Sequence, residues 1–278
     1  MYREAYPPWE SHKEVFHIAK EEGLICFSTP FDKTAVDFLE SLGNPIYKIA
    51  SFEITDIPLI EYAAKKMKPM VISTGIATEE DIRLAVDTCR SVGNDDITLL
   101  KCTSSYPAPV EEANLCMMKD LAERFHVKSG LSDHTMGSIS AIVAVSQGAA
   151  MIEKHFIIDR SIGGPDASFP MDEQEFAQMV NDVRMAEAAM GAVSYELTDK
   201  MKAGSDFCRS LYVSEDMKAG DVITEQNVRS VRPGFGLHPK HMKDILGKKV
   251  KCDLEKGSRF TMNYVDCECL KMMYCSKE

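Results

Sequence analysis

Short apolar runs alternate with longer amphipathic segments from residue 24 to residue 190. The runs are rich in β-branched side chains, which is typical of buried strands, while the segments between them space their apolar residues as a helix does. Strands that alternate with helices at intervals of roughly 20–30 residues predict βαβ units and a parallel sheet. The runs predicted to be strands are 24–29, 46–51, 70–74, 97–102, 127–132 and 150–156.

Two of the intervening helices carry clear signals. Thr78 and Asp81 form a capping-box pattern at the start of 78–92, and Gly93 closes that segment. The stretch 171–190 is long, with apolar residues at helical spacing. We expect a helix in each.

Polar side chains stand at or just after the end of every predicted strand. In an open parallel sheet only the strands beside the switch point need reactive ends. Polar ends on all strands instead predict a ring of strands that converge on one mouth, as in a (β/α)8 barrel, although the pattern shows six strands where such a barrel has eight. The residues are Thr29, Ser51, Glu53, Ser73, Thr74, Thr103, Ser132, Asp133, His134 and His155.

The composition and the spacing of apolar residues change after residue 190. Short β-like runs, frequent Gly and Pro turn signals and one brief helix around 238–246 predict a second, small β-rich domain. The predicted division is a partial barrel domain at 1–190, a linker at 191–207, the small domain at 208–266 and a tail at 267–278.

Composition narrows the classes of function. The net charge of −11 argues against a nucleic-acid partner unless a local basic patch exists. No apolar run approaches the length of a membrane span, and the N-terminus is not a signal peptide. The nine cysteines are an odd number and several lie in predicted strands, so they indicate reduced thiols of a cytoplasmic protein. The tail, with Cys267, Cys269 and Cys275, is interpreted as a chain end without fixed structure rather than as a metal site.

Two histidines are the strongest candidates for chemistry. His134 and His155 end neighbouring predicted strands, an arrangement that suits a divalent ion with positions left open for substrate. A hydrogen-bonded structural role is the alternative for each. Because side chains alternate along a strand, Glu153 shares the face of His155, and Lys154 on the other face is expected to leave the apolar layer at the strand's end.

The other candidates suit an anionic substrate. Lys48, inside a barrel, needs an anion, either Glu53 or a bound carboxylate or phosphate. Hydroxyl groups around the same mouth can donate to phosphate oxygens, and N-cap or turn roles are their alternative. In "DRSIGGPDASF", Asp166 can bind substrate hydroxyls, or the segment is a plain turn. The hydroxyl residues are Thr29, Ser51, Ser73 and Ser132.

A series of motifs resembles the sialic acid synthase family, which condenses phosphoenolpyruvate with an amino sugar to make nonulosonic acids. The resemblance extends from about residue 8 to residue 265. It implies a (β/α)8 barrel followed by an antifreeze-like (SAF) domain, in a domain-swapped homodimer. The motifs, in chain order, are "STPFD", "YKIASFEITDIPLI", "VISTGIATEEDI", "TSSYPAP", "GLSDHTMG", "IEKHF", "GGPDASF" and "RSVRPGFGLHP".

The resemblance also implies roles for individual residues. His134 and His155 resemble the ligands of a manganese or magnesium ion, and Arg232 resembles an arginine that reaches into the partner subunit's active site. The residues that resemble the phosphoenolpyruvate site are Thr29, Lys48, Ser51, Ser73 and Ser132. The residues that resemble acidic groups of the reacting centre are Glu53 and Glu153, and those that resemble sugar contacts are Tyr106 and Asp166.

Within the family, "SFEITD" and "GGPDASF" resemble pseudaminic acid synthases more than N-acetylneuraminate synthases. Phe52 stands where the latter have a small residue, and we hypothesise that it forms an apolar wall for a 6-deoxy sugar. An N-acetylneuraminate or legionaminate synthase is the alternative enzyme, and a sugar-binding protein without activity is the alternative of another class. The family also has a longer front that holds two further strands, so we expect this chain to be truncated, to leave two sheet edges open and to lack full activity.

Overall fold

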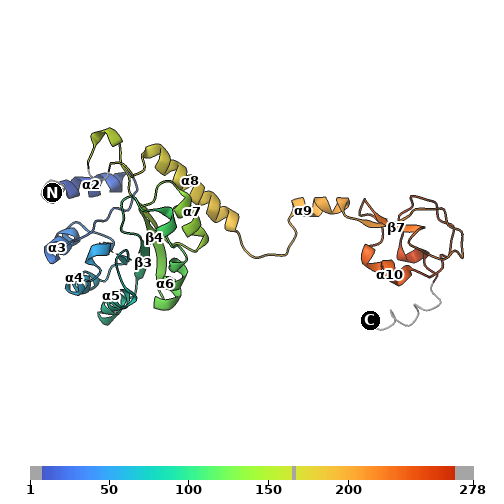
Figure 1. Ribbon diagram of the computed structural model, residues 1–278, viewed down its shortest axis with the longest axis horizontal. Coiled ribbons are helices and arrows are strands. Elements are labelled where there is room, and N and C mark those ends of the chain that lie inside the picture. The colour runs from blue at the N-terminus through green and yellow to red at the C-terminus, as the bar shows by residue number, and fades with distance from the viewer. Residues whose placement is uncertain (1–7, 165–166, 267–278) are drawn as a thin grey trace. The chain divides into compact units, whose positions relative to one another are not determined.

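The computed structural model describes residues 8–164 and 167–266, and the chain divides into two compact units between Ala192 and Val193. The first unit contains a curled parallel sheet with helices on its outer side, and the second is a small β-rich unit (Figure 1).

Among the described residues, the sheet of the first unit has five parallel strands whose spatial order is their order in the chain. This order is that of consecutive strands in a barrel wall, and it confirms the predicted series of βα units. The strands are β1 (Tyr47–Ile49), β2 (Met70–Ser73), β3 (Ile97–Cys102), β4 (Lys128–Asp133) and β5 (Ile152–Lys154).

The prediction of a strand at 24–29 is wrong. In the structure this segment has no regular secondary structure, and Leu24 and Ile25 expose 68% and 74% of their surface. It is anchored through the Ser28 N–H, which donates to Asn44 Oδ1 at 3.2 Å. A strand exists only where a neighbour pairs with its backbone, and within residues 8–164 and 167–266 no strand pairs with this run. Its apolar composition alone therefore does not make it a strand.

The helices of the first unit match the sequence pattern. At α5, Thr78 Oγ1 accepts from the Asp81 N–H at 3.2 Å and Asp81 Oδ2 accepts from the Thr78 N–H at 2.9 Å, which confirms the capping box. Of the helices in the part of the chain that is described, none is long and apolar enough to cross a membrane. The helices are α2 (Trp9–Glu21), α3 (Lys33–Ser41), α4 (Ile57–Ala64), α5 (Glu79–Ser91), α6 (Met117–Phe125), α7 (Ile139–Ser146) and α8 (Glu173–Met190).

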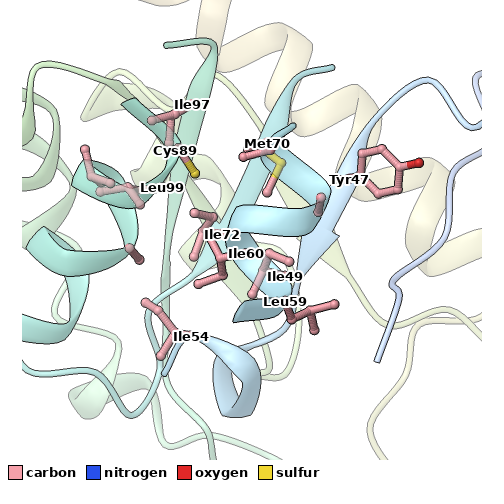
Figure 2. Close-up of a cluster of buried hydrophobic side chains, with 14 of the residues drawn as sticks. Tyr47, Ile49, Ile54, Leu59, Ile60, Met70, Ile72, Cys89, Ile97 and Leu99 are labelled. Carbon is pink, nitrogen blue, oxygen red and sulfur yellow. The ribbon is translucent and has the colours of Figure 1, made fainter. Parts of the chain in front are cut away.

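The main hydrophobic core lies between the outer face of the sheet and the helices, as Figure 2 shows. Tyr47 is in register with Met70, and Met70 with Ile97, so these side chains share one face. They pack against helix residues such as Leu59 and Cys89, which are buried. Because side chains alternate along a strand, Lys48, Ser73, Ser132 and Glu153 belong to the opposite, inner face. The core residues thus decide which polar residues point inward.

The second unit has its own core, which in its described part surrounds an antiparallel pair of strands, β6 (Ser210–Val213) and β7 (Val228–Val231). Leu211, Val228 and Phe260 are fully buried in it. The predicted brief helix is present as α10 (Met242–Ile245). The segment 191–207, predicted as a linker, contains the short helix α9 (Asp199–Ala203) and a 3-10 turn, Gly204–Phe207.

Candidate active site on the inner face of the sheet

The two edge strands of the sheet meet through their side chains. Lys48 on β1 and Glu153 on β5 lie 3.5 Å apart, from Nζ to Oε2. In a flat sheet the four strand spacings between β1 and β5 would separate their backbones by about 19 Å. The sheet must therefore curl strongly, as a section of a barrel does, and its inner face is concave.

Lys48 and Glu153 form the polar centre of this face. The Lys48 side chain is only 7% exposed, while that of Glu153 is 37% exposed. Ser132 Oγ donates to Glu153 Oε1 at 2.6 Å. Sequence reasoning paired Lys48 with Glu53 or a bound anion, and the structure shows Glu153 as its ion-pair partner. A lysine has three N–H donors, and one of them bonds the Ile49 carbonyl oxygen at 3.3 Å.

Within the described part of the chain, three buried oxygen atoms lie at the same ends of the strands without a hydrogen-bond partner. Glu53 Oε2, Ser73 Oγ and Ser104 Oγ are buried and make no hydrogen bond to the residues that the structure describes. Burial raises the pKa of Glu53, although the charge of Lys48 opposes the shift. Buried polar atoms without partners are costly and uncommon, so a polar group that reached these oxygens would be stabilised there. Ser104 was not predicted; its signal was its place just after β3, in "TSSYPAP".

Gly75 lets the loops after β1, β2 and β3 come together. A Cβ atom at this position would lie 2.1 Å from Ser104 Oγ and 2.8 Å from Ser51 Oγ. The Gly75 N–H donates to Ser51 Oγ at 3.1 Å, which orients that hydroxyl. Only glycine permits this approach, and sequence reasoning did not single it out.

The structure brings His134 and His155 together, with their ring centroids 5.2 Å apart. His134 Nδ1 lies 2.9 Å from the carbonyl oxygen of Thr103. A carbonyl only accepts, so Nδ1 carries the proton and the Nε2 lone pair is left for another partner. Tyr106 lies against His134 at 4.2 Å and Phe169 against His155 at 4.8 Å, between ring centroids.

This donor set fits an exchangeable divalent ion. Two imidazoles lie close together, and the tautomer of His134 presents Nε2. Among residues 8–164 and 167–266 there is no cluster of three His, Cys, Asp or Glu side chains that could hold a metal ion. An ion held by the two histidines would therefore keep positions for water and substrate oxygens.

Cys102 adds a thiol next to the histidine pair. Its Sγ lies 3.9 Å from His134 Nδ1. Burial raises the pKa of this thiol, but the interaction with His134 and hydrogen bonds with Ser51 and Ser132 outweigh burial, so the pKa lies below its usual value. Sequence reasoning treated Cys102 only as a reduced thiol in a strand.

The expectation that Lys154 leaves the apolar layer is wrong. Its side chain is 2% exposed and forms an ion pair with Asp133, which is 1% exposed, at 2.7 Å from Nζ to Oδ2. An ion pair lowers the cost of burying a lysine, so the side chain stays inside. The pair lies on the outer side of the two strands that end at the histidines.

Comparison with known proteins decides the family. The NeuB family matches residues 1–195, and the SAF domain matches residues 209–263. The chain belongs to the NeuB family. A pseudaminic acid synthase of Helicobacter pylori is 47% identical over 267 residues, which are 96% of this chain and 78% of that protein. An N,N'-diacetyllegionaminic acid synthase of Legionella pneumophila is 35% identical over 262 residues, which are 92% of this chain and 74% of that protein.

The fold agrees with that of a solved structure. The crystal structure of a putative spore coat polysaccharide biosynthesis protein E from Chromobacterium violaceum has a TM-score of 0.75 and 25% identity, and covers 96% of this chain and 81% of that one. The first unit is thus a TIM-barrel-like NeuB fold of which the described residues form a five-stranded section, and the second is a SAF domain.

Four further residues were singled out from the sequence as candidates. Thr29 is half-buried in the coil that precedes α3, and Phe52 is 59% exposed beside Glu53. Asp166 and the tail from residue 267 lie outside the described residues. Arg232 is exposed just after β7 of the SAF unit. The structure therefore brings Lys48, Ser132 and Glu153 into one group and the two histidines with Tyr106 into another.

Proposed function

We propose that the chain condenses phosphoenolpyruvate with an amino sugar to form a nonulosonic acid, and that this product is pseudaminic acid. The observation that carries the proposal is the inner face of the curled sheet. A buried lysine and three buried oxygens without partners among the described residues lie near the strand ends from which the two histidines also extend.

The charge on this face suits phosphoenolpyruvate. Lys48 is buried and paired with Glu153, and besides the N–H groups that face Glu153 and the Ile49 carbonyl it has a third donor for a substrate oxygen. The hydroxyls of Ser51 and Ser73 can donate to phosphate and carboxylate oxygens, whereas that of Ser132 already donates to Glu153. With a net charge of −11 on the chain, a local cation is needed to hold an anionic substrate.

The two glutamates suit different parts of the reaction. Bound at His134 and His155, a divalent ion would polarise the carbonyl oxygen of the open-chain sugar. Glu153, an ion-paired acceptor, can stabilise the positive charge that develops at the enol carbon while the vinyl carbon bonds to the aldehyde. Glu53, whose pKa burial raises, can take a proton from the water that adds to that carbon. The former aldehyde oxygen takes up a proton to become a hydroxyl, and the hydroxyl added from water becomes the ketone as the C–O bond to phosphate breaks and inorganic phosphate leaves.

Pseudaminic acid is favoured over the alternatives by two observations. The relative named as a pseudaminic acid synthase is 47% identical to this chain, against 35% for the one named as a legionaminic acid synthase. Phe52 exposes much of its ring beside Glu53 and can offer the apolar wall that a 6-deoxy sugar requires.

The experiment measures phosphate release from phosphoenolpyruvate with Mn²⁺ and each of the amino-sugar precursors of pseudaminic, legionaminic and N-acetylneuraminic acids. We expect release with the first. Lys48→Met should abolish it, whereas Lys65→Met, which breaks an exposed ion pair with Glu61 on the outer helix α4, should not. Phe52→Gly should shift the preference among the sugars. Binding of a sugar by the folded chain with no phosphate release would indicate a sugar-binding protein instead.

We also propose that two copies form a domain-swapped homodimer in which Arg232 of one copy serves the other. The resemblance around "VRPGFG" supports this, together with the separate cores of the two units. Manganese or magnesium as the ion and a cytoplasmic location remain predictions.

A further inference from the structure

Asp133 and Lys154 form a buried ion pair at the last ladder position of β4 and β5. The two residues are in register across the strands, and both side chains are almost fully buried. Lys154 Nζ donates to Asp133 Oδ2 at 2.7 Å, to the Gly137 carbonyl at 3.1 Å and to the Thr135 carbonyl. All three ammonium donors are therefore used. None of the proposed chemistry involves this pair.

The same carboxylate also holds the residue on the far side of His134. Asp133 Oδ1 accepts from the Thr135 N–H at 2.9 Å and from the Thr135 hydroxyl at 2.8 Å. His134 thus lies between Asp133, which carries the carboxylate, and Thr135, which is bonded to that carboxylate. His155 follows Lys154 directly in the chain, so its backbone is next to a residue whose side chain is fixed by the ion pair. The ion pair therefore links the chain segment that carries His134 to the one that carries His155.

We propose that Asp133 and Lys154 are positioning residues that set the mutual orientation of His134 and His155. Their side chains point outward, and the histidines, one residue later, belong to the inner face. A bond between the outward residues therefore fixes the separation of the two backbones from which the imidazoles extend. The role of this orientation rests on the proposed function, in which the two histidines hold a divalent ion. The orientation itself is inferred from the contacts of Asp133 and Lys154.

A general contribution to stability is the competing explanation. Buried ion pairs often contribute little more than an apolar pair of the same volume, while loss of one partner leaves an uncompensated charge. Single substitutions alone cannot separate the two explanations, because both predict a weaker fold. A double substitution that removes both charges does separate them.

The test compares Mn²⁺ affinity and the imidazole ¹⁵N NMR spectrum of the metal-free chain in four variants. Three variants change the pair: Lys154→Met, Asp133→Asn and the double Asp133→Leu/Lys154→Met. The fourth, Lys68→Met, is the control. It breaks the partly buried ion pair between Lys68 and Glu40, which lies before β2, at the opposite end of the strands. Circular dichroism establishes that each variant is folded. We expect the first three to weaken Mn²⁺ binding by about 10- to 100-fold, as loss of groups that orient ligands does.

The spectrum should change with the affinity. In the unsubstituted chain His134 should show one tautomer, with the proton on Nδ1 for the Thr103 carbonyl, and the pair variants should show a mixture. The double variant should be more thermally stable than the single variants, because it leaves no unpaired buried charge. Its Mn²⁺ affinity should stay low, because leucine and methionine cannot form hydrogen bonds with the Thr135 and Gly137 carbonyls. Lys68→Met should leave both measurements unchanged.

Folded double variants with the affinity and spectrum of the unsubstituted chain would overturn the proposal. If the unsubstituted chain fails to bind Mn²⁺, the proposed ion site is wrong, and the NMR comparison still decides whether the pair orients the histidines. The two failures are therefore distinguishable.

Discussion

Two carboxylates near one lysine have different surroundings in this site. Glu153 is paired with Lys48 and accepts the Ser132 hydroxyl, whereas Glu53 has one oxygen buried without a partner among the described residues. Different surroundings are how two groups of the same chemistry take different roles. A paired carboxylate is suited to stabilising charge, and one with a raised pKa is suited to moving a proton.

The first prediction concerns Glu53. Burial raises the pKa of its carboxyl, so the proton leaves at a higher pH than from an ordinary glutamate. If the carboxylate is the base, phosphate release should fall as the pH drops through that raised pKa. Glu53→Gln should remove this acid limb and slow the reaction by about 10²- to 10⁴-fold.

The pH dependence of kcat provides the measurement. Glu61→Gln, on the outer helix α4, is the control and should keep the limb. An acid limb that persists unchanged in Glu53→Gln would assign the base to another group.

At the scale of elements, α5 shows how local sequence fixes a helix that supports the site from outside. Its capping box joins Thr78 and Asp81, and its first turn carries Glu79, Glu80 and Asp81 where the helix dipole favours negative charge. Its buried residues pack against the outer face of the sheet. The helix therefore contributes to stability without reaching the inner face.

The second prediction follows from this placement. Thr78→Ala should lower the free energy of unfolding by about 1 kcal/mol, because an orphan N–H loses its acceptor. Thr78→Ser should restore most of that loss, and kcat should not change. Urea unfolding measures the difference.

The matched control is Thr88→Ala within the same helix, where the hydroxyl bonds the Leu84 carbonyl and caps nothing. Alanine has the higher helix propensity, so this variant should be no less stable than the parent. Equal stability of Thr78→Ala and Thr88→Ala would show that the capping box contributes nothing measurable.

At the scale of the whole molecule, the chain combines a barrel section and a SAF unit that each bury their own core. Arg232 belongs to the SAF unit and Lys48 to the barrel section. A domain-swapped dimer would let these two residues serve one site from different copies. This arrangement makes a prediction that a monomer does not.

The third prediction is complementation between variants. Lys48→Met and Arg232→Ala should each be inactive alone. Refolded together in equal amounts, they should recover about a quarter of the parent activity, since half of the dimers are mixed and each mixed dimer has one intact site.

Phosphate release by the refolded mixture measures this, with sedimentation to establish the dimer. Arg229→Ala, on exposed β7, serves as the control and should stay active alone. Activity no greater than the sum of the separate variants would place Arg232 in its own copy's site or in none.

The local pattern of the sequence determined much of this protein. Strand and helix periodicity predicted the parallel βα series, α5 with its cap, and α8, because each depends on neighbouring residues. The alternation of side chains along strands also predicted that His155 and Glu153 share a face. The family resemblance predicted the SAF unit and the residues to examine.

Only the tertiary structure decided which of these groups meet. The curl of the sheet brings Lys48 to Glu153, the register of β4 and β5 pairs Asp133 with Lys154, and Gly75 admits the Ser104 loop. The run at 24–29 has the composition of a strand but no partner in the described chain. In each case the outcome depends on residues far apart in the sequence, whose proximity no local period encodes.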